Sequence, residues 1–234
     1  MAKKQNVREQ LEQEEQLRTE QVEERVNKID QFFKENSKPI WICTAAIVII
    51  VLAVICYINF YLQPKKAEAR EQMFPAEAAF MENNWELALK GDGNTLGFEQ
   101  VLEDYGAKGG QSIYFYAGVC ELKLGNYENA VNYLKKYNGK DDILKARALG
   151  ALGDAYVGLG ENSYKTAISC YDKAAAQVDN IFTASYLMKA GELYEEMGNA
   201  DNALTYYKKI KDQYPQSIEG YDIDKYITRI EAAQ

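Results

Sequence analysis

The sequence predicts an all-α protein with an N-terminal amphipathic helix, a single transmembrane helix and an α-solenoid of about four helix pairs closed by a C-terminal capping helix. Three observations predict this architecture. Apolar residues before Pro39 recur at helical spacing, and no residue from Pro39 to Pro64 is charged. After residue 110, glycines and an alanine recur three times in one pattern, as in proteins built from repeats.

Composition excludes several kinds of site. The chain has no histidine, which removes the commonest general base and transition-metal ligand. Its formal net charge is −8, and an acidic surface repels phosphate, so we expect no nucleic-acid partner. Cys43, Cys56, Cys120 and Cys170 form no CxxC pair and are interpreted as small apolar residues, with a Cys120–Cys170 disulfide left open. We therefore expect no catalytic residue, metal, cofactor or small-molecule substrate.

Residues 1–38 form the first predicted part, a helical arm. Val22, Val26, Ile29 and Phe33 follow one another at helical spacing, within a segment rich in Glu, Gln, Lys and Arg. This narrow stripe fits a short coiled coil or a handle for a cytoplasmic partner. It equally fits a solvated helix beside the membrane, and both interpretations stay open.

Residues 39–63 form the predicted transmembrane helix, with its apolar part at residues 40–62. Twenty-three residues span about 34 Å in a helix, which exceeds the roughly 30 Å of a bilayer's hydrocarbon core. Trp41 lies at one end and Tyr57 and Tyr61 at the other, where aromatic rings favour the membrane interface. Four basic residues lie in the nineteen before Pro39 and three in the nineteen after Leu62, a small excess that favours a cytoplasmic N-terminus.

Small and large residues recur in three copies beyond residue 110. Each copy has a glycine, a second glycine seven residues later, an alanine and then a large residue. The copies are Gly118, Gly125, Ala130 and Leu134; Gly153, Gly160, Ala167 and Tyr171; and Gly191, Gly198, Ala203 and Tyr207. We expect the first glycine to let a second helix approach closely and the second glycine to end the first helix in a left-handed turn. The large residue should fill the seam between the two helices.

The pattern resembles the tetratricopeptide repeat. The third copy matches that signature almost throughout, the second has about two extra residues near Asn162, and the first departs from it at Glu121, where tyrosine is usual. Residues 111–216 are assigned to three repeats. Residues 64–110 are assigned to a linker helix and a degenerate first repeat, with helices through Phe80–Lys90 and Leu96–Tyr105. Residues 217–234 are assigned to a capping helix through Tyr221–Ala232.

The order of the parts is similar to that of the YfgM-like ancillary subunits of the bacterial SecYEG translocon. The glycine-rich stretch from Gly91 to Phe98 and the segment from Leu124 to Ala130 also look like that group. The resemblance implies a bacterial inner-membrane protein with a periplasmic repeat domain. It implies protein partners among translocon subunits, periplasmic chaperones or emerging secreted chains. The alternative is a scaffold subunit of a fixed cell-envelope complex for secretion or division; an enzyme is not expected.

Placing the repeat signature on the sequence predicts which residues of each first helix face a concave protein-binding groove. They are Phe115, Val119, Leu122 and Lys123, then Arg147, Asp154 and Val157, then Met188, Glu192, Glu195 and Glu196. This groove would run from apolar to acidic and accept a segment with an apolar anchor and a basic end. The alternative is a solvated helix face. Phe115 and Val119 occupy places where some tetratricopeptide domains carry a Lys/Asn clamp for a C-terminal carboxylate, so we expect no ligand of that kind.

Overall fold

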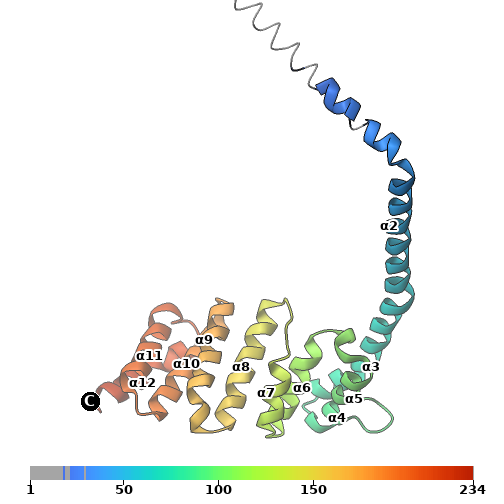
Figure 1. Cartoon of the computed structure of the whole chain (residues 1–234). Coiled ribbons are helices and arrows are strands. Elements are labelled where there is room, and N and C mark those ends of the chain that lie inside the picture. Colours follow the sequence, from blue (N-terminus) through green and yellow to red (C-terminus); the bar gives the residue numbers. More distant parts are fainter. Residues whose placement is uncertain (1–17, 19–21, 29, 234) are drawn as a thin grey trace, which may run out of the picture. The chain divides into compact units, whose positions relative to one another are not determined.

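The computed structural model describes residues 18, 22–28 and 30–233, and the regular structure among them is helical apart from one isolated bridge between Gly91 and Leu96 (Figure 1). The chain divides into two compact units, Met1–Leu62 and Gln63–Gln234. Residues 1–17, 19–21 and 29 of the predicted arm, Ile29 of the stripe among them, lie outside the described residues.

The described part of the arm is helical over residues 22–28 and 30–35. Lys28 lies 2.7 Å from Glu24, an ion pair one helical turn apart that contributes a few tenths of a kcal/mol to helix stability. Val22, Val26 and Phe33 are each more than half exposed. The stripe is therefore present but uncovered, and pairing of the arm stays a prediction.

An apolar helix follows the arm. Helix α2 covers Ser37–Tyr57 and contains no buried residue, and the π-helical turn η1 covers Ile58–Leu62. The helix continues to Met81, and its most apolar 18-residue window has a mean hydropathy of 2.8, so it is long and apolar enough to cross a membrane. Pro64 lies two residues after the π turn. Since proline has no N–H for the carbonyl four residues earlier, the wider turn occurs where the regular hydrogen-bond ladder is interrupted.

The second unit begins with α3 (Gln63–Met81), α4 (Trp85–Lys90), α5 (Phe98–Tyr105) and the 3-10 turn η2 (Gly106–Gly109). The helix expected through Phe80–Lys90 is thus wrong, because α3 ends at Met81 and α4 starts afresh. Asn83 takes a left-handed φ of 60°, and the Asn84 side chain accepts a hydrogen bond from the Leu87 N–H at 3.3 Å. These two asparagines supply a turn and an N-cap, which a helix interior does not need.

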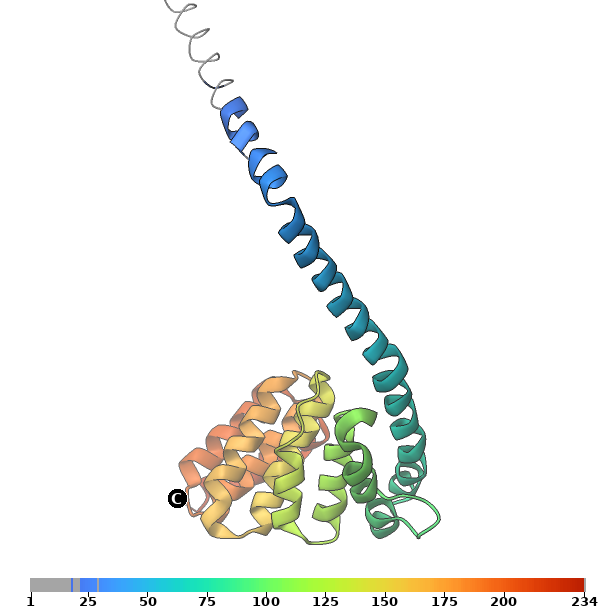
Figure 2. The same cartoon turned by 45° about the vertical axis from the view of Figure 1, so that its right-hand side comes forward.

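Three helix pairs and a last helix follow, and they lie side by side in a row in both views (Figures 1 and 2). The pairs are α6 (Ser112–Lys123) with α7 (Tyr127–Leu134), α8 (Asp142–Gly158) with α9 (Tyr164–Gln177), and α10 (Ile181–Glu196) with α11 (Ala200–Gln213). The 3-10 turn η3 (Glu161–Ser163) lies between α8 and α9, where the sequence has its extra residues. Helix α12 (Ile218–Glu231) closes the row.

Each pair is closed at a glycine, as the sequence predicts. A Cβ atom on Gly118 would lie 2.6 Å from Cγ of Leu134, and Cβ atoms on Gly153 and Gly191 would overlap the rings of Tyr171 and Tyr207. The second glycines, Gly125, Gly160 and Gly198, have φ values of 81°, 95° and 71°. The close approach and the left-handed turns are therefore confirmed in all three pairs.

Polar bonds between neighbouring pairs join residues about one repeat apart. The Tyr206 hydroxyl donates to Asp172 at 2.7 Å, and Arg229 lies 2.7 Å from Glu195. The partners are 34 residues apart in both cases. Equivalent positions on successive repeats therefore face one another, which is the contact pattern of a solenoid.

Helix α12 covers the end of the row. Ile223, Ile227 and Ile230 are buried against α10 and α11, so the helix seals the last apolar face. It begins three residues before the predicted Tyr221, because the Ser217 hydroxyl caps it by accepting a hydrogen bond from the Gly220 N–H at 3.0 Å.

A candidate protein-binding groove

Helices α6, α8 and α10, the first of each pair, form two adjoining hollows. The first hollow has a volume of about 220 Å³ and the second about 260 Å³. Asp154 and Lys189 line both, so the hollows form one feature, which we call the first-helix groove. The first hollow is lined by Phe80, Phe115, Val119, Leu122, Lys123, Arg147, Gly150, Ala151, Asp154, Tyr186 and Lys189. The second is lined by Asp154, Val157, Tyr171, Lys189, Glu192, Leu193 and Glu196.

Nine of the eleven residues predicted for the groove line these hollows. Met188 and Glu195 line neither. Met188 is 9% exposed and packs in the core between α10, α11 and α12. Glu195 instead accepts a hydrogen bond from the Tyr207 hydroxyl at 3.0 Å and pairs with Arg229. The structure thus places these two side chains in the packing of the last repeat; binding at the other nine stays a prediction.

An ion pair lies where the two hollows meet. Lys189 Nζ is 2.7 and 2.8 Å from the two carboxylate oxygens of Asp154, and the Tyr171 hydroxyl donates to Oδ1 of Asp154 at 2.7 Å. Both charged side chains are about one-third exposed. Burial and the Asp154 charge raise the pKa of Tyr171, so this phenol stays protonated and remains a donor. The charges of Asp154 and Lys189 therefore cancel within the groove.

The first hollow combines an apolar lining with two cations. The Arg147 guanidinium lies 5.5 Å from the centre of the Phe115 ring, a cation–π contact, and Lys123 is exposed at the rim. Val119 and Leu122 supply aliphatic surface. Among the described residues, neither Arg147 nor Lys123 has a carboxylate within ion-pair distance. This hollow can therefore offer guanidinium and ammonium donors beside an apolar surface.

The second hollow carries carboxylates. Glu196 accepts a hydrogen bond from the Tyr164 hydroxyl at 2.7 Å, a neutral donor that leaves its charge in place. Burial raises the pKa of the Glu192 carboxyl, although nearby Lys189 lowers it. The Glu192 side chain is exposed but partly shielded from water, and a basic ligand group would stabilise its charge.

Sequence reasoning missed Lys189, Tyr186 and Phe80. A signal for Lys189 existed, because it lies three residues before Glu192 on the same helix face and 35 after Asp154, about one repeat. Tyr186 continues that face by another three residues, and its ring lies against Gly150 of α8. Phe80 lies on α3, outside the three matched repeats, so repeat spacing carried no signal for it.

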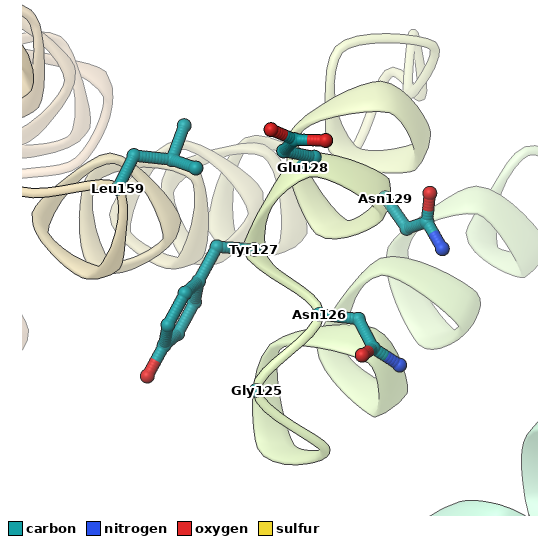
Figure 3. A pocket seen from close by; sticks show the side chains of 6 residues that line it. All are labelled: Gly125, Asn126, Tyr127, Glu128, Asn129 and Leu159. Atoms are coloured by element: carbon teal, nitrogen blue, oxygen red, sulfur yellow. The ribbon is translucent and has the colours of Figure 1, made fainter.

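A separate hollow of about 360 Å³ lies at the turn between α6 and α7 (Figure 3). Figure 3 shows the Asn126 and Asn129 side chains on one side of the turn and the Tyr127 ring on the other. The amides of Asn126 and Asn129 donate to the buried carboxylate of Glu121 at 2.7 and 2.9 Å. Their polar groups are already engaged in holding the turn, so we assign this hollow a structural role.

The cysteines are free, and two of them are buried. Cys120 and Cys170 are buried and free, so the disulfide left open by the sequence is not formed. Burial, with a smaller effect of the Glu121 charge, raises the pKa of the Cys120 thiol to about 12. Within the described part of the chain, no group of three or more Cys, Asp or Glu side chains is placed to hold a metal ion.

Comparison with known proteins supports a tetratricopeptide repeat protein. The tetratricopeptide repeat family model matches residues 113–140 and 185–217, which cover most of α6–α7 and of α10–α11. It does not match α8–α9, the pair with the extra turn η3. No curated protein matches the sequence. Tetratricopeptide repeats are protein-interaction modules, so the matched segments imply an adaptor that binds other proteins, and they indicate no catalytic family.

Solved structures agree on the fold. A crystal structure of MamA protein shares 21% identity, with a TM-score of 0.55 over 71% of this chain and 84% of that one. A second MamA crystal structure also shares 21% identity, with a TM-score of 0.51 over 68% of this chain and 88% of that one. A thermophilic tetratricopeptide repeat protein of Thermus thermophilus shares 17% identity over 70% of this chain and 99% of that one, but its TM-score of 0.36 is too low to support an argument.

Proposed function

We propose that this chain is a membrane-anchored adaptor that binds a segment of a protein partner in its first-helix groove. The groove itself carries the proposal. Three successive repeats contribute to it, its surface combines apolar and charged side chains, and the cations of its first hollow have no anionic partner among the described residues apart from the Asp154–Lys189 pair. Such a surface suits an extended or helical peptide.

We propose that residues 40–62 hold the protein in the bacterial inner membrane. The length of this helix, its mean hydropathy of 2.8 and the absence of buried residues in α2 support a span surrounded by lipid. The small excess of basic residues before Pro39 supports a cytoplasmic N-terminus and hence a periplasmic repeat domain.

Within the envelope, we propose an ancillary role at the Sec translocon and among periplasmic chaperones. The resemblance in the order of parts and in the Gly91–Phe98 stretch supports this role. The partners would then be translocon subunits, chaperones or emerging secreted chains, bound without turnover.

Site-specific photo-crosslinking in intact cells tests the groove. A photoreactive amino acid replaces Val119 in the first hollow, and Lys145, an exposed residue of α8 that lines neither hollow, is the matched control. We expect protein adducts at position 119 and few at position 145. Translocon subunits with transient clients would support the adaptor, whereas one stoichiometric partner would indicate the scaffold. Equal adducts at both positions would refute binding in the groove.

Topology is tested by replacing exposed Lys165 with cysteine and adding a membrane-impermeant maleimide to cells with a permeabilised outer membrane. Cys120 and Cys170 are buried but Cys43 and Cys56 are exposed, so the unchanged chain, which has all four, supplies the background. We expect labelling without opening the inner membrane. Labelling only after that membrane is opened would place the domain in the cytoplasm and end the translocon proposal.

A further inference from the structure

We infer that the first-helix groove reads the order of charges in its ligand. The segment that it takes carries an acidic group next to a bulky apolar side chain, and a basic group farther along. This inference rests on the proposed function, namely that the groove binds a protein segment. It adds a requirement for an anionic group, which the apolar-to-acidic pattern in the sequence does not predict.

The first hollow supplies the site for the acidic group. Three cations and one carboxylate line it, and the carboxylate of Asp154 is taken up by Lys189 at 2.7 and 2.8 Å. Arg147 and Lys123 remain uncompensated. A guanidinium that lies over an aromatic ring, as Arg147 does over Phe115, keeps its N–H edge available for a carboxylate. The adjacent apolar surface accounts for the bulky neighbour in the ligand.

The second hollow supplies the site for the basic group. Its cation, Lys189, is already paired with Asp154, so Glu192 and Glu196 give it a net negative charge. Arg229, the nearby base on α12, is held 2.7 Å from Glu195; its charge acts on Glu192, but among the described residues it forms no ion pair with Glu192 or Glu196. The hollow also offers Val157 and Leu193, against which the methylene stem of a lysine or arginine can pack.

Because of the Asp154–Lys189 pair, binding depends on the order of acidic and basic groups along the ligand. It is neutral as a unit and separates a positive hollow from a negative one. A ligand with the basic group beside its apolar anchor would place that base against Arg147 and its acid against Glu192. Like charges would then meet in both hollows, which is how repulsion enforces specificity.

Four fluorescein-labelled peptides test the inference on the full-length chain in an uncharged detergent. The first has Glu directly before Phe and a Lys beyond a neutral Ser/Gly spacer. The second exchanges Glu and Lys, the third has Gln in both places, and the fourth replaces Phe of the first by Ser. A series of spacer lengths covers the distance between the hollows. Fluorescence polarisation reports binding at low and at high salt.

We expect the first peptide to bind best, about tenfold more tightly than the charge-exchanged peptide, since two contacts turn from attraction to repulsion. High salt should reduce this difference. R147E should weaken the first peptide about fivefold and strengthen the exchanged one. The control K145E makes the same change of charge on the same helix outside the groove and should alter neither. Both residues are exposed, and unchanged far-UV circular dichroism and melting temperatures would show that both variants fold.

The outcomes separate the two proposals. Tight binding that depends on Phe but is equal for the charged, exchanged and neutral peptides would overturn charge order and leave the groove as a protein-binding site. Equal effects of R147E and K145E would overturn it as well. Failure of every peptide to bind, together with equal crosslinking at positions 119 and 145, would overturn the proposed function itself.

Discussion

The pair α6–α7 differs from α8–α9 and α10–α11 in the residue that fills the seam opposite its glycine. Leu134 fills the first seam, whereas Tyr171 and Tyr207 fill the other two. The phenol of each tyrosine crosses the seam and donates to a carboxylate of the paired first helix, Asp154 at 2.7 Å and Glu195 at 3.0 Å. Leu134 has no donor to offer.

The seam residue and the groove residue match in the first two pairs, whereas Tyr207 of the third pair bonds Glu195, which lines neither hollow. On α6, the residues one and four positions after the seam glycine are Val119 and Leu122, which are both apolar. On α8, the residue one position after the seam glycine is Asp154. A partly buried carboxylate needs a hydrogen-bond donor, and the tyrosine on the second helix of the pair provides one across the seam. The change from leucine to tyrosine along the row thus accompanies the change of the groove from apolar to acidic.

We expect the largest loss of stability when the seam tyrosine is replaced. Y171L shrinks a side chain that is 2% exposed and deletes the hydrogen bond to Asp154, so we expect the free energy of unfolding to fall by about 3 kcal/mol. Chemical denaturation followed by circular dichroism measures the change. Y221L, at a side chain that is 75% exposed, is the control and should change it by less than about 0.5 kcal/mol. A loss below about 1 kcal/mol for Y171L would show that the phenol does not hold the seam.

Substitution of the seam glycines should give the next largest loss in the free energy of unfolding. A methyl group in G153A meets the rigid Tyr171 ring, whereas one in G118A meets Leu134, whose side chain can turn aside. We expect losses of about 2 and about 1 kcal/mol, after the gain in helix propensity of about 1 kcal/mol that both share. Denaturation measures both, and equal losses would remove the distinction between the two kinds of seam.

The reactivity of the buried thiols shows which helices a glycine substitution destabilises. Burial raises the pKa of both Cys120 on α6 and Cys170 on α9, so each thiol reacts only when the packing around it opens. Cys120 packs against α3, α4 and α5, whereas Cys170 packs against α7 and α8. G153A, which disturbs α8, should therefore speed the reaction of Cys170 more than that of Cys120, measured with a thiol reagent in native buffer; equal rates would show that the damage is not local.

The tyrosine and carboxylate of α8–α9 can be introduced into α6–α7 to test whether the two residues depend on each other. L134Y places a phenol in the first seam opposite Gly118, where its hydroxyl meets aliphatic neighbours, and should lower the free energy of unfolding by about 2 kcal/mol. Adding V119D supplies the carboxylate that α8 has at Asp154. A double-mutant cycle should then return a favourable coupling of about 1 kcal/mol. Zero coupling would mean that seam and groove vary independently.

The smallest effect concerns pH. Burial raises the pKa of the Glu192 carboxyl above its ordinary value of 4.5, so the folded state binds this proton more tightly than the unfolded state. Stability from this group is fully present below pH 4.5 and is lost as pH rises through the folded-state pKa. E192Q removes that loss and should raise the free energy of unfolding at pH 7 by about 0.3 kcal/mol, since solvent screens an exposed side chain. The same variant should show no gain at about pH 4, measured by denaturation at both values; a gain of equal size there would exclude an effect of charge.

Much of the fold was accessible from sequence because helix pairs repeat local signals. The turn glycines and the seam residues follow from a spacing that a helix imposes on its own faces. The break between α3 and α4 was missed because Asn83 and Asn84 lie inside a pattern that otherwise continues a helix. The groove residues predicted on α6 and α8 line the hollows, as do Glu192 and Glu196 on α10, but Met188 on α10 is buried in the core. Which face a helix presents depends on how it rotates against its neighbours, and spacing alone does not encode that rotation.

The sequence by itself determined the apolar helix, the three glycine-closed pairs and most of the groove's members, because each rests on residues within one or two helices. Only the tertiary structure decided how the groove is charged. Asp154 meets Tyr171 across a seam and Lys189 across a repeat, partners 17 and 35 residues away. Stacking of the pairs brings these groups together, cancels the central charges and leaves Arg147 and Glu192 on opposite sides of a neutral ion pair.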